Sequence, residues 1–154
     1  RMLPNYRGSA VAKPAADDAM FVNVYNNTGS ALTAYAPYNL VPGWITGIGV
    51  VYVPIVPATN AAVRNLIGIP QKALADKASM LVQVGGLVPI CATSSTVAAN
   101  DQLQVIDAGT ALIDEGSNGL AIQTTDACGV AVSLVDTDQW KVYLFGRYCS
   151  IAGS

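Results

Sequence analysis

Hydrophobic residues along this chain occur in short runs that end at turn-forming residues, most clearly over residues 81–124. The apolar runs there are rich in Val, Ile and Leu: Leu81–Val84, Leu87–Ala92, Leu103–Ile106, Thr110–Ile113 and Leu120–Gln123. The turn signals that separate them are Gly85-Gly86, Thr93–Thr96, Asp107–Gly109 and Asp114–Gly119. Runs of this length are typical of strands and too short for globular helices. The stretch therefore predicts a β-meander.

The chain before this stretch shows the same kind of pattern. Met20–Tyr25 alternates as a strand does and ends at the turn signal Asn26–Ser30. A second turn is predicted at Pro42-Gly43, and Trp44–Val56 is the longest β-rich run, in which glycines indicate a bulge or kink. Thr59–Asn65 predicts one helical turn, the single helical segment we expect.

The chain after the meander predicts a hairpin. Val130–Val135 and Trp140–Phe145 are separated by the turn residues Asp136–Gln139. Both faces of the last strand carry apolar or aromatic side chains, which predicts burial on both sides. We therefore expect an all-β fold, either a compact β-barrel or a two-layer β-sandwich.

The length of 154 residues suits one domain. We expect an extended N-terminal arm over residues 1–18, one all-β domain over residues 19–148 and a C-terminal tail over residues 149–154. The arm carries Arg1, Arg7 and Lys13 without an acidic partner before Asp17. Three charges over this length are too few to indicate a nucleic-acid partner.

Charged residues make up 12% of the chain and hydrophobic residues 52%. The charged share is about half of that in ordinary soluble domains. We infer that part of the apolar surface is buried between subunits; a turn-rich, Ala-padded monomer is the alternative. No apolar run is long enough to span a bilayer, so we expect no membrane partner.

Candidate catalytic chemistry is sparse. The chain contains no histidine, which excludes the Ser–His–Asp and Cys–His arrangements. Ser79 and Lys77 are two residues apart and could merely share one face of a strand. Asp114 and Glu115 are neighbours, which point in opposite directions on a strand. We therefore predict no catalytic residue and no enzymatic activity.

Metal, cofactor and modification sites are not indicated either. Cys91, Cys128 and Cys149 lack the spacing of metal ligands, and Cys91 is expected to be a small buried hydrophobic residue. Asp101, Asp107 and Asp126 could hold calcium between subunits, but no calcium-binding pattern surrounds them. The sequon at Asn26 is interpreted as a chance match. We expect no cofactor.

The segments VQVGGLVPI and VAANDQLQV, joined by a Ser/Thr turn, carry a resemblance to a known family. They resemble the capsid decoration (cement) proteins of tailed bacteriophages, in which V-x-V-x-G-V-V-P-V precedes V-A-A-G-D-x-L. Gly119–Ile122 stands in the place of the family's G-x-A-like strand. The resemblance covers residues 66–146. This chain has Asp76-Lys77 where Asp-Gly is usual and Asn100-Asp101 where Gly-Asp is usual.

The resemblance implies a structural protein of the virion. Such a protein is made in the host cytoplasm, is usually a homotrimer and binds the major capsid protein on the outer surface of an assembled phage head. Two alternatives stay open. One is a different virion or tail structural protein. The other is a carbohydrate-binding β-module, which would need a groove lined by Trp44, Trp140 or tyrosines.

Overall fold

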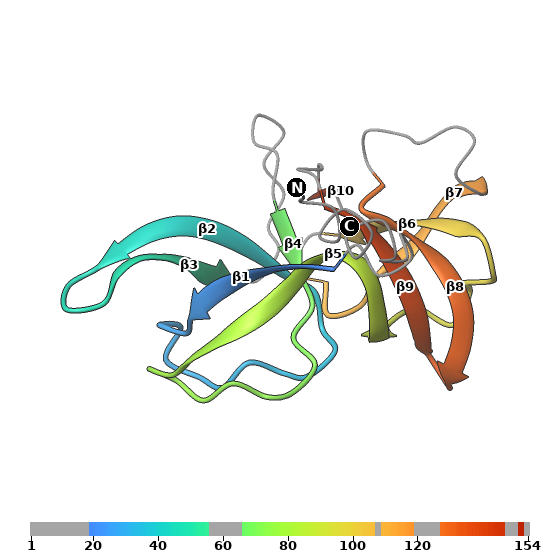
Figure 1. The fold of residues 1–154 in the computed structure, drawn as a ribbon. Helices are drawn as coiled ribbons and strands as arrows, with labels where there is room; N and C mark the ends of the chain where they lie inside the picture. Colours follow the sequence, from blue (N-terminus) through green and yellow to red (C-terminus); the bar gives the residue numbers. More distant parts are fainter. Residues whose placement is uncertain (1–18, 56–65, 107–108, 119–126, 147–150, 153–154) are drawn as a thin grey trace, which may run out of the picture.

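The structure is a computed structural model that describes residues 19–55, 66–106, 109–118, 127–146 and 151–152. The described residues form ten strands and no helix, which confirms the all-β class (Figure 1). The strands are β1 (Met20–Tyr25), β2 (Tyr38–Ile45), β3 (Gly49–Ile55), β4 (Leu66–Gly68), β5 (Ser79–Ala92), β6 (Asp101–Ile106), β7 (Ile113–Asn118), β8 (Gly129–Asp136), β9 (Gln139–Phe145) and β10 (Ile151–Ala152). This part of the chain contains no helix that is long and apolar enough to cross a membrane.

The strands belong to one mixed sheet with the order β10-β6-β8-β9-β5-β1-β3-β2-β4, and β7 pairs with β6 at the side of this path. The sheet has two ends, so it does not close into the barrel that was one of our two expectations. A single bridge between Ile69 and Gln83 links the end of the path near β4 back to β5.

The long strand β5 joins the two halves of the sheet. Its residues 79–85 pair with β1 and its residues 85–92 pair with β9. The turn predicted at Gly85-Gly86 is therefore wrong, because both glycines lie inside one 14-residue strand. Gly86 has φ 82°, and the side-chain nitrogen of Gln83 donates to the carbonyl oxygens of Gly85 and Leu87 at 2.9 and 3.0 Å. These bonds hold the irregularity at the glycines.

We call β1 to β4 with the first half of β5 the first lobe. Its core cluster contains buried residues from these strands and from two loops: Val24, Leu32, Leu40, Leu66, Leu74, Val82 and Val84. β2 and β3 form a hairpin that reverses at residues 46–48, where Gly47 and Gly49 have φ of 84° and 105°. The turn predicted at Pro42-Gly43 is wrong. β4 pairs with β2 only as far as Leu40, and Pro42 lies beyond that point. The N–H that proline lacks is therefore not needed for a hydrogen bond to β4.

The second half of β5 with β6 to β9 forms the second lobe. The predicted hairpin of Val130–Val135 and Trp140–Phe145 is present as β8 and β9. On β9, Val142 and Leu144 are buried in the core, whereas Tyr143 and Phe145 are half-buried. The second face is thus less covered than we expected.

The acidic segment of the second lobe also differs from expectation. The turn predicted at Asp114–Gly119 is replaced in the described residues by β7, which pairs with β6. Gly116 in this strand has φ 97°, so the backbone there is irregular without reversing the chain. In the tail, β10 runs parallel to β6, with Ile151 opposite Val105. The arm 1–18, the helical turn Thr59–Asn65 and the run Leu120–Gln123 lie outside the described residues.

Candidate interaction surface

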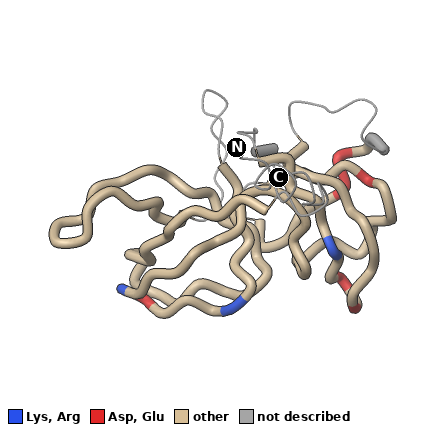
Figure 2. Tube along the Cα trace, in the orientation of Figure 1, with Lys and Arg blue, Asp and Glu red and all other residues tan. Residues whose placement is uncertain are grey.

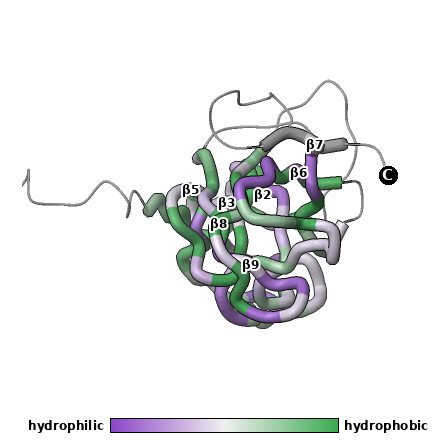
Figure 3. Tube along the Cα trace, turned by 90° about the vertical axis from the view of Figure 1, so that its right-hand side faces the viewer, coloured by the Kyte–Doolittle hydropathy of each residue, from purple (hydrophilic) through white to green (hydrophobic). Residues whose placement is uncertain are grey.

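Charged residues are absent from one lobe's strands and concentrated in the other lobe. Residues 19–63 and 78–100 contain no Asp, Glu, Lys or Arg, so strands β1 to β5 carry no charge. The described charged residues of the first lobe, Lys72, Asp76 and Lys77, lie in the loop between β4 and β5 (Figure 2). In the second lobe the described charged residues are Asp101, Asp114, Glu115, Asp136, Asp138 and Lys141. Seen from the side, hydrophilic segments lie at the turns in the lower part of the view and also near β6 and β7 in its upper part (Figure 3).

The β2–β3 hairpin projects from the first lobe as a two-stranded ribbon (Figure 1). Its ladder runs from Asn39 opposite Ile55 to Ile45 opposite Gly49. β4 pairs only with Tyr38–Leu40, and β1 pairs with β3 only at Tyr52. Among the described strands, none pairs with the outer part of the hairpin as a third strand. A ribbon of two strands alone is only marginally stable in water.

The outer part of this hairpin is apolar. Trp44 and Val50 lie directly opposite each other and are 72% and 78% exposed. Ile48, in the turn, is also exposed. We call these three residues the hairpin tip. Residues in such a cross-strand pair have Cβ atoms about 5 Å apart, so Trp44 and Val50 form one continuous apolar surface.

A second apolar surface lies over β1 and β5. Phe21 is exposed, and Leu81 on β5 is 64% exposed. In this ladder Asn23 lies opposite Leu81 and Phe21 opposite Gln83, so Phe21 and Leu81 share one face of the sheet. The opposite face carries Val24 and other core residues. We call Phe21 and Leu81 the β1–β5 patch.

Both surfaces are carried on a framework that buried amides hold together. Asn26 is fully buried, and its side-chain nitrogen donates to the carbonyl oxygens of Ser30 and Leu74 at 2.8 and 2.9 Å. Gln71 exchanges two bonds with the backbone of Ile90, at 2.8 and 3.2 Å. The sequon at Asn26 thus belongs to the fold, because a side chain that is buried and bonded in this way cannot accept a glycan.

The residues weighed for catalysis are not brought together into a site. Ser79 is exposed at the start of β5, and Lys77 is exposed in the preceding turn, where its Nζ atom lies 4.0 Å from Oδ2 of Asp76. Asp114 accepts a bond of 2.8 Å from the backbone N–H of Gly116. Glu115 follows it on β7 and therefore points to the other face.

Metal-ligating residues do not cluster within the described ranges either. No group of His, Cys, Asp or Glu side chains there is arranged to hold a metal ion. Asp101 is buried, and its Oδ2 accepts a bond of 2.7 Å from the N–H of Ala98, which closes the turn before β6. Asp107 and Asp126 lie outside the described residues. The role seen for Asp101 is to shape a turn.

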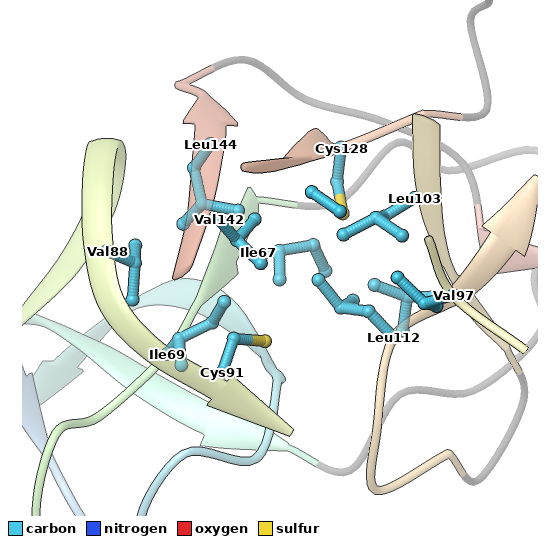
Figure 4. Packing of buried hydrophobic residues seen from close by; sticks show 12 residues of the cluster. Ile67, Ile69, Val88, Cys91, Val97, Leu103, Leu112, Cys128, Val142 and Leu144 are labelled. Atoms are coloured by element: carbon cyan, nitrogen blue, oxygen red, sulfur yellow. The ribbon is translucent and has the colours of Figure 1, made fainter. Parts of the chain in front are cut away.

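Two of the three cysteines belong to the core of the second lobe (Figure 4). Cys91 and Cys128 are both buried, which confirms the expectation for Cys91. Burial raises the pKa of the Cys91 thiol far above its ordinary value. A thiol in that state is a poor nucleophile at neutral pH. Cys149 lies outside the described residues.

The two tryptophans do not line a common groove. Trp44 is on β2, and Trp140 is on β9, half-buried against the second-lobe core. β5, β1 and β3 lie between these strands in the sheet order. An apolar cavity of about 230 Å³ lies between residues 33–38, Ala92 and residues 109–110, and a hollow of about 390 Å³ lies beside Met20 and Tyr143. Neither is lined by tryptophan, whereas Tyr38 lines the cavity and Tyr143 lines the hollow.

The backbone at two turns bears on the resemblance seen in the sequence. Lys77 has φ 64° and Asn100 has φ 72°. These are the two positions at which the decoration proteins usually have glycine. Glycine is favoured where φ is positive, because other side chains are strained there. The turns of this chain therefore have the backbone conformation that a family glycine implies.

Comparisons with known proteins give a structural likeness. No family model matches the sequence, and no curated protein matches it. Among solved structures, the N base of the head fiber gp8.5 of bacteriophage phi29 is similar, with a TM-score of 0.49 and 12% sequence identity. The likeness covers 84% of this chain and 98% of that chain. At this level of similarity the function has to be argued from the residues of this chain.

Proposed function

We propose that this chain is a structural protein of a tailed-phage virion. More specifically, it is a capsid decoration (cement) protein that binds the major capsid protein on the outer surface of an assembled head. Its role there is mechanical and not enzymatic. Self-association into a homotrimer and production in the host cytoplasm are parts of the same proposal.

The observation that carries this proposal is the backbone at the two turns where the sequence departs from the family pattern. Lys77 and Asn100 replace family glycines and still have φ of 64° and 72°. A chance match of short apolar segments would have no reason to place left-handed residues at both positions, because such residues are uncommon outside glycine. The agreement in turn geometry supports the resemblance over residues 66–146.

The surface supports an assembly role. Strands β1 to β5 are uncharged, and the exposed hydrophobic side chains of the first lobe include Trp44, Val50 and Leu81. Exposed apolar groups of this kind mark contacts with other proteins. Many copies bound to one shell would each add contacts that the bare shell lacks, and binding that favours the intact shell raises its stability by mass action.

Thermal release of the packaged genome tests the proposal. Heads that lack the protein are heated in the presence of a nucleic-acid dye, with and without added purified protein. We expect bare heads to assemble but to release their genome at a lower temperature, and we expect the added protein to restore the higher temperature as occupancy rises. Few charges are available to be screened, so the effect should survive moderate salt.

Two outcomes would contradict the proposal in different ways. Identical release curves with heads fully occupied would remove the stabilising role. Binding to purified tails with no binding to heads would instead favour the alternative of a tail structural protein. Cosedimentation of the protein with each particle separates these outcomes before any heating.

A further inference from the structure

The first lobe carries two separate apolar surfaces, and we propose that they bind each other between copies of this chain. The hairpin tip of one copy packs on the β1–β5 patch of a second copy. This contact deepens the proposed function and rests on it for its biological role, since it names the surfaces through which decoration subunits would associate. Its physical basis is independent of any head.

The hairpin tip and the β1–β5 patch of one copy cannot pack against each other, because they lie on opposite sides of the sheet. Along β2, Trp44 shares a face with Leu40, which is buried in the first-lobe core. The tip therefore continues the core-facing side of the sheet beyond the point where the core ends. Phe21 and Leu81 point away from that core. No described residue of the same copy covers either surface, and a second molecule can cover both.

The absence of charged residues favours the β1–β5 patch as the surface that the hairpin tip binds. No residue of β1, β2, β3 or β5 is charged. The described part of the second lobe carries five acidic residues and one lysine (Figure 2). Burial of an unpaired carboxylate against tryptophan carries a desolvation penalty. Packing of the tip on the uncharged first lobe of another copy avoids that penalty.

The use of two different surfaces limits the assemblies that can form. A contact between unlike surfaces closes as a reciprocal twofold dimer, in which the tip of each copy covers the patch of the other, or as a larger head-to-tail ring. We call each of these closed assemblies a ring. In a ring every copy uses its tip once and its patch once.

The size of the contact also favours a ring. A buried Trp side chain covers up to about 250 Å², so Trp44 at 72% exposure offers well over half of that area. One side of a standard interface buries about 800 Å². A single tip-to-patch contact is therefore too small for a stable complex, whereas a closed assembly gives each copy two contacts. Trp is also the side chain most enriched among residues that dominate binding energy.

Light scattering coupled to size-exclusion chromatography tests the contact. Trp44→Ser changes the tip, and Leu81→Ser changes the patch. Each variant alone should be monomeric at concentrations at which the wild type is a ring, with association weakened about thirtyfold or more, the loss expected of a hot-spot residue. Leu134→Ser on β8 is the matched control, because Leu134 is 62% exposed and Leu81 is 64% exposed. It should leave the ring intact.

Mixing the two variants gives the sharper readout. The Trp44→Ser copy keeps its patch and the Leu81→Ser copy keeps its tip, so an equimolar mixture should form a one-to-one heterodimer that goes no further. A self-contacting hairpin would give homodimers of the Leu81→Ser copy and no heterodimer, and that result would overturn the proposal. A monomeric wild type, or variants that stay oligomeric while their thermal melts match the wild type, would overturn it too.

The proposed contact and the proposed function can each be refuted without the other. A ring that forms as described but gives heads no protection would refute the decoration role and leave the contact standing. Protection of heads by variants that keep the wild-type mass would refute the contact and leave the decoration role standing.

Discussion

Replacement of Asn26 by alanine should remove a large part of the stability of the first lobe. The Asn26 side chain makes four hydrogen bonds although it is fully buried. Its nitrogen donates to the carbonyl oxygens of Ser30 and Leu74. Its Oδ1 accepts from the N–H and the hydroxyl of Thr28, at 3.0 and 2.7 Å. One side chain thus ties the turn after β1 to the loop before β5.

The loss in free energy of unfolding depends on which hydrogen-bond partners of Asn26 can reach water after the substitution. Thr28 and Ser30 are exposed, so each bond lost there should cost about 1 kcal/mol or less. The bond to Leu74 is buried, but the carbonyl oxygen of Leu74 also accepts a bond of 2.8 Å from the N–H of Leu32, so the loss of the Asn26 bond should cost about 1 kcal/mol. We expect a total of about 3–4 kcal/mol, out of a typical stability of 5–15 kcal/mol. For a chain of this size that corresponds to a fall in Tm of about 10 °C.

Urea unfolding followed by circular dichroism measures the loss. Asn27→Ala is the matched control, because Asn27 is the next residue and is exposed, and it should change the free energy of unfolding by less than about 0.5 kcal/mol. All variants have to be compared at one protein concentration, because the stability of an oligomer depends on it. An Asn26→Ala variant within about 1 kcal/mol of the wild type would refute the reasoning.

Three further predictions concern single sites. Lys77→Gly should raise the free energy of unfolding by about 1 kcal/mol and Asn100→Gly by less, because both residues have positive φ and Asn tolerates it better; a loss in urea unfolding would contradict this. Gly129→Ala should cost about 2 kcal/mol or more, because its Cβ would lie 2.5 Å from the carbonyl oxygen of Tyr143, whereas Gly43→Ala, with its nearest contact at 3.7 Å, should change Tm little; equal Tm values would contradict it. Burial raises the pKa of the Cys91 thiol, so the stability it contributes is present below the ordinary thiol pKa of about 8.5 and is lost as the pH rises above it. A thiol reagent at pH 8 should react with Cys91 slowly before unfolding and rapidly after it, and fast reaction of the folded protein would count against the burial.

Local signals in the sequence were enough to predict several elements. The alternation in Met20–Tyr25 predicted β1 with the same bounds, and the turn residues Asp136–Gln139 predicted the β8–β9 hairpin. Both signals act between residues that are close in sequence. The burial of Cys91 was predicted as well, because a thiol in an apolar strand has few other places to go.

Turn-forming residues were a weaker guide. Gly85-Gly86, Pro42-Gly43 and Asp114–Gly119 all predicted reversals, yet each lies in or overlaps a strand. Such residues permit a reversal but do not require one. Whether the chain turns there depends on distant partners: β5 continues through its glycines because β9 pairs with the residues beyond them.

The sequence predicted that apolar surface would be buried between subunits, but it did not predict where that surface lies. The low share of charged residues indicated buried contacts between subunits, but composition does not say where exposed apolar residues gather. The separation of Trp44 from Trp140 by three strands follows from a sheet order that no local pattern encodes. The same holds for Asn26, whose partner Leu74 is 48 residues away.

The sequence by itself thus determined the class of the fold, the location of several strands and the low content of charged residues. Strand periodicity and composition are properties of the chain alone. Only the tertiary structure decided that the sheet stays open, that β5 belongs to both lobes, and that no other described strand pairs with the outer part of the uncharged β2–β3 hairpin. Those features depend on which distant strands pair. Pairing is set by the burial of side chains from both partners at once.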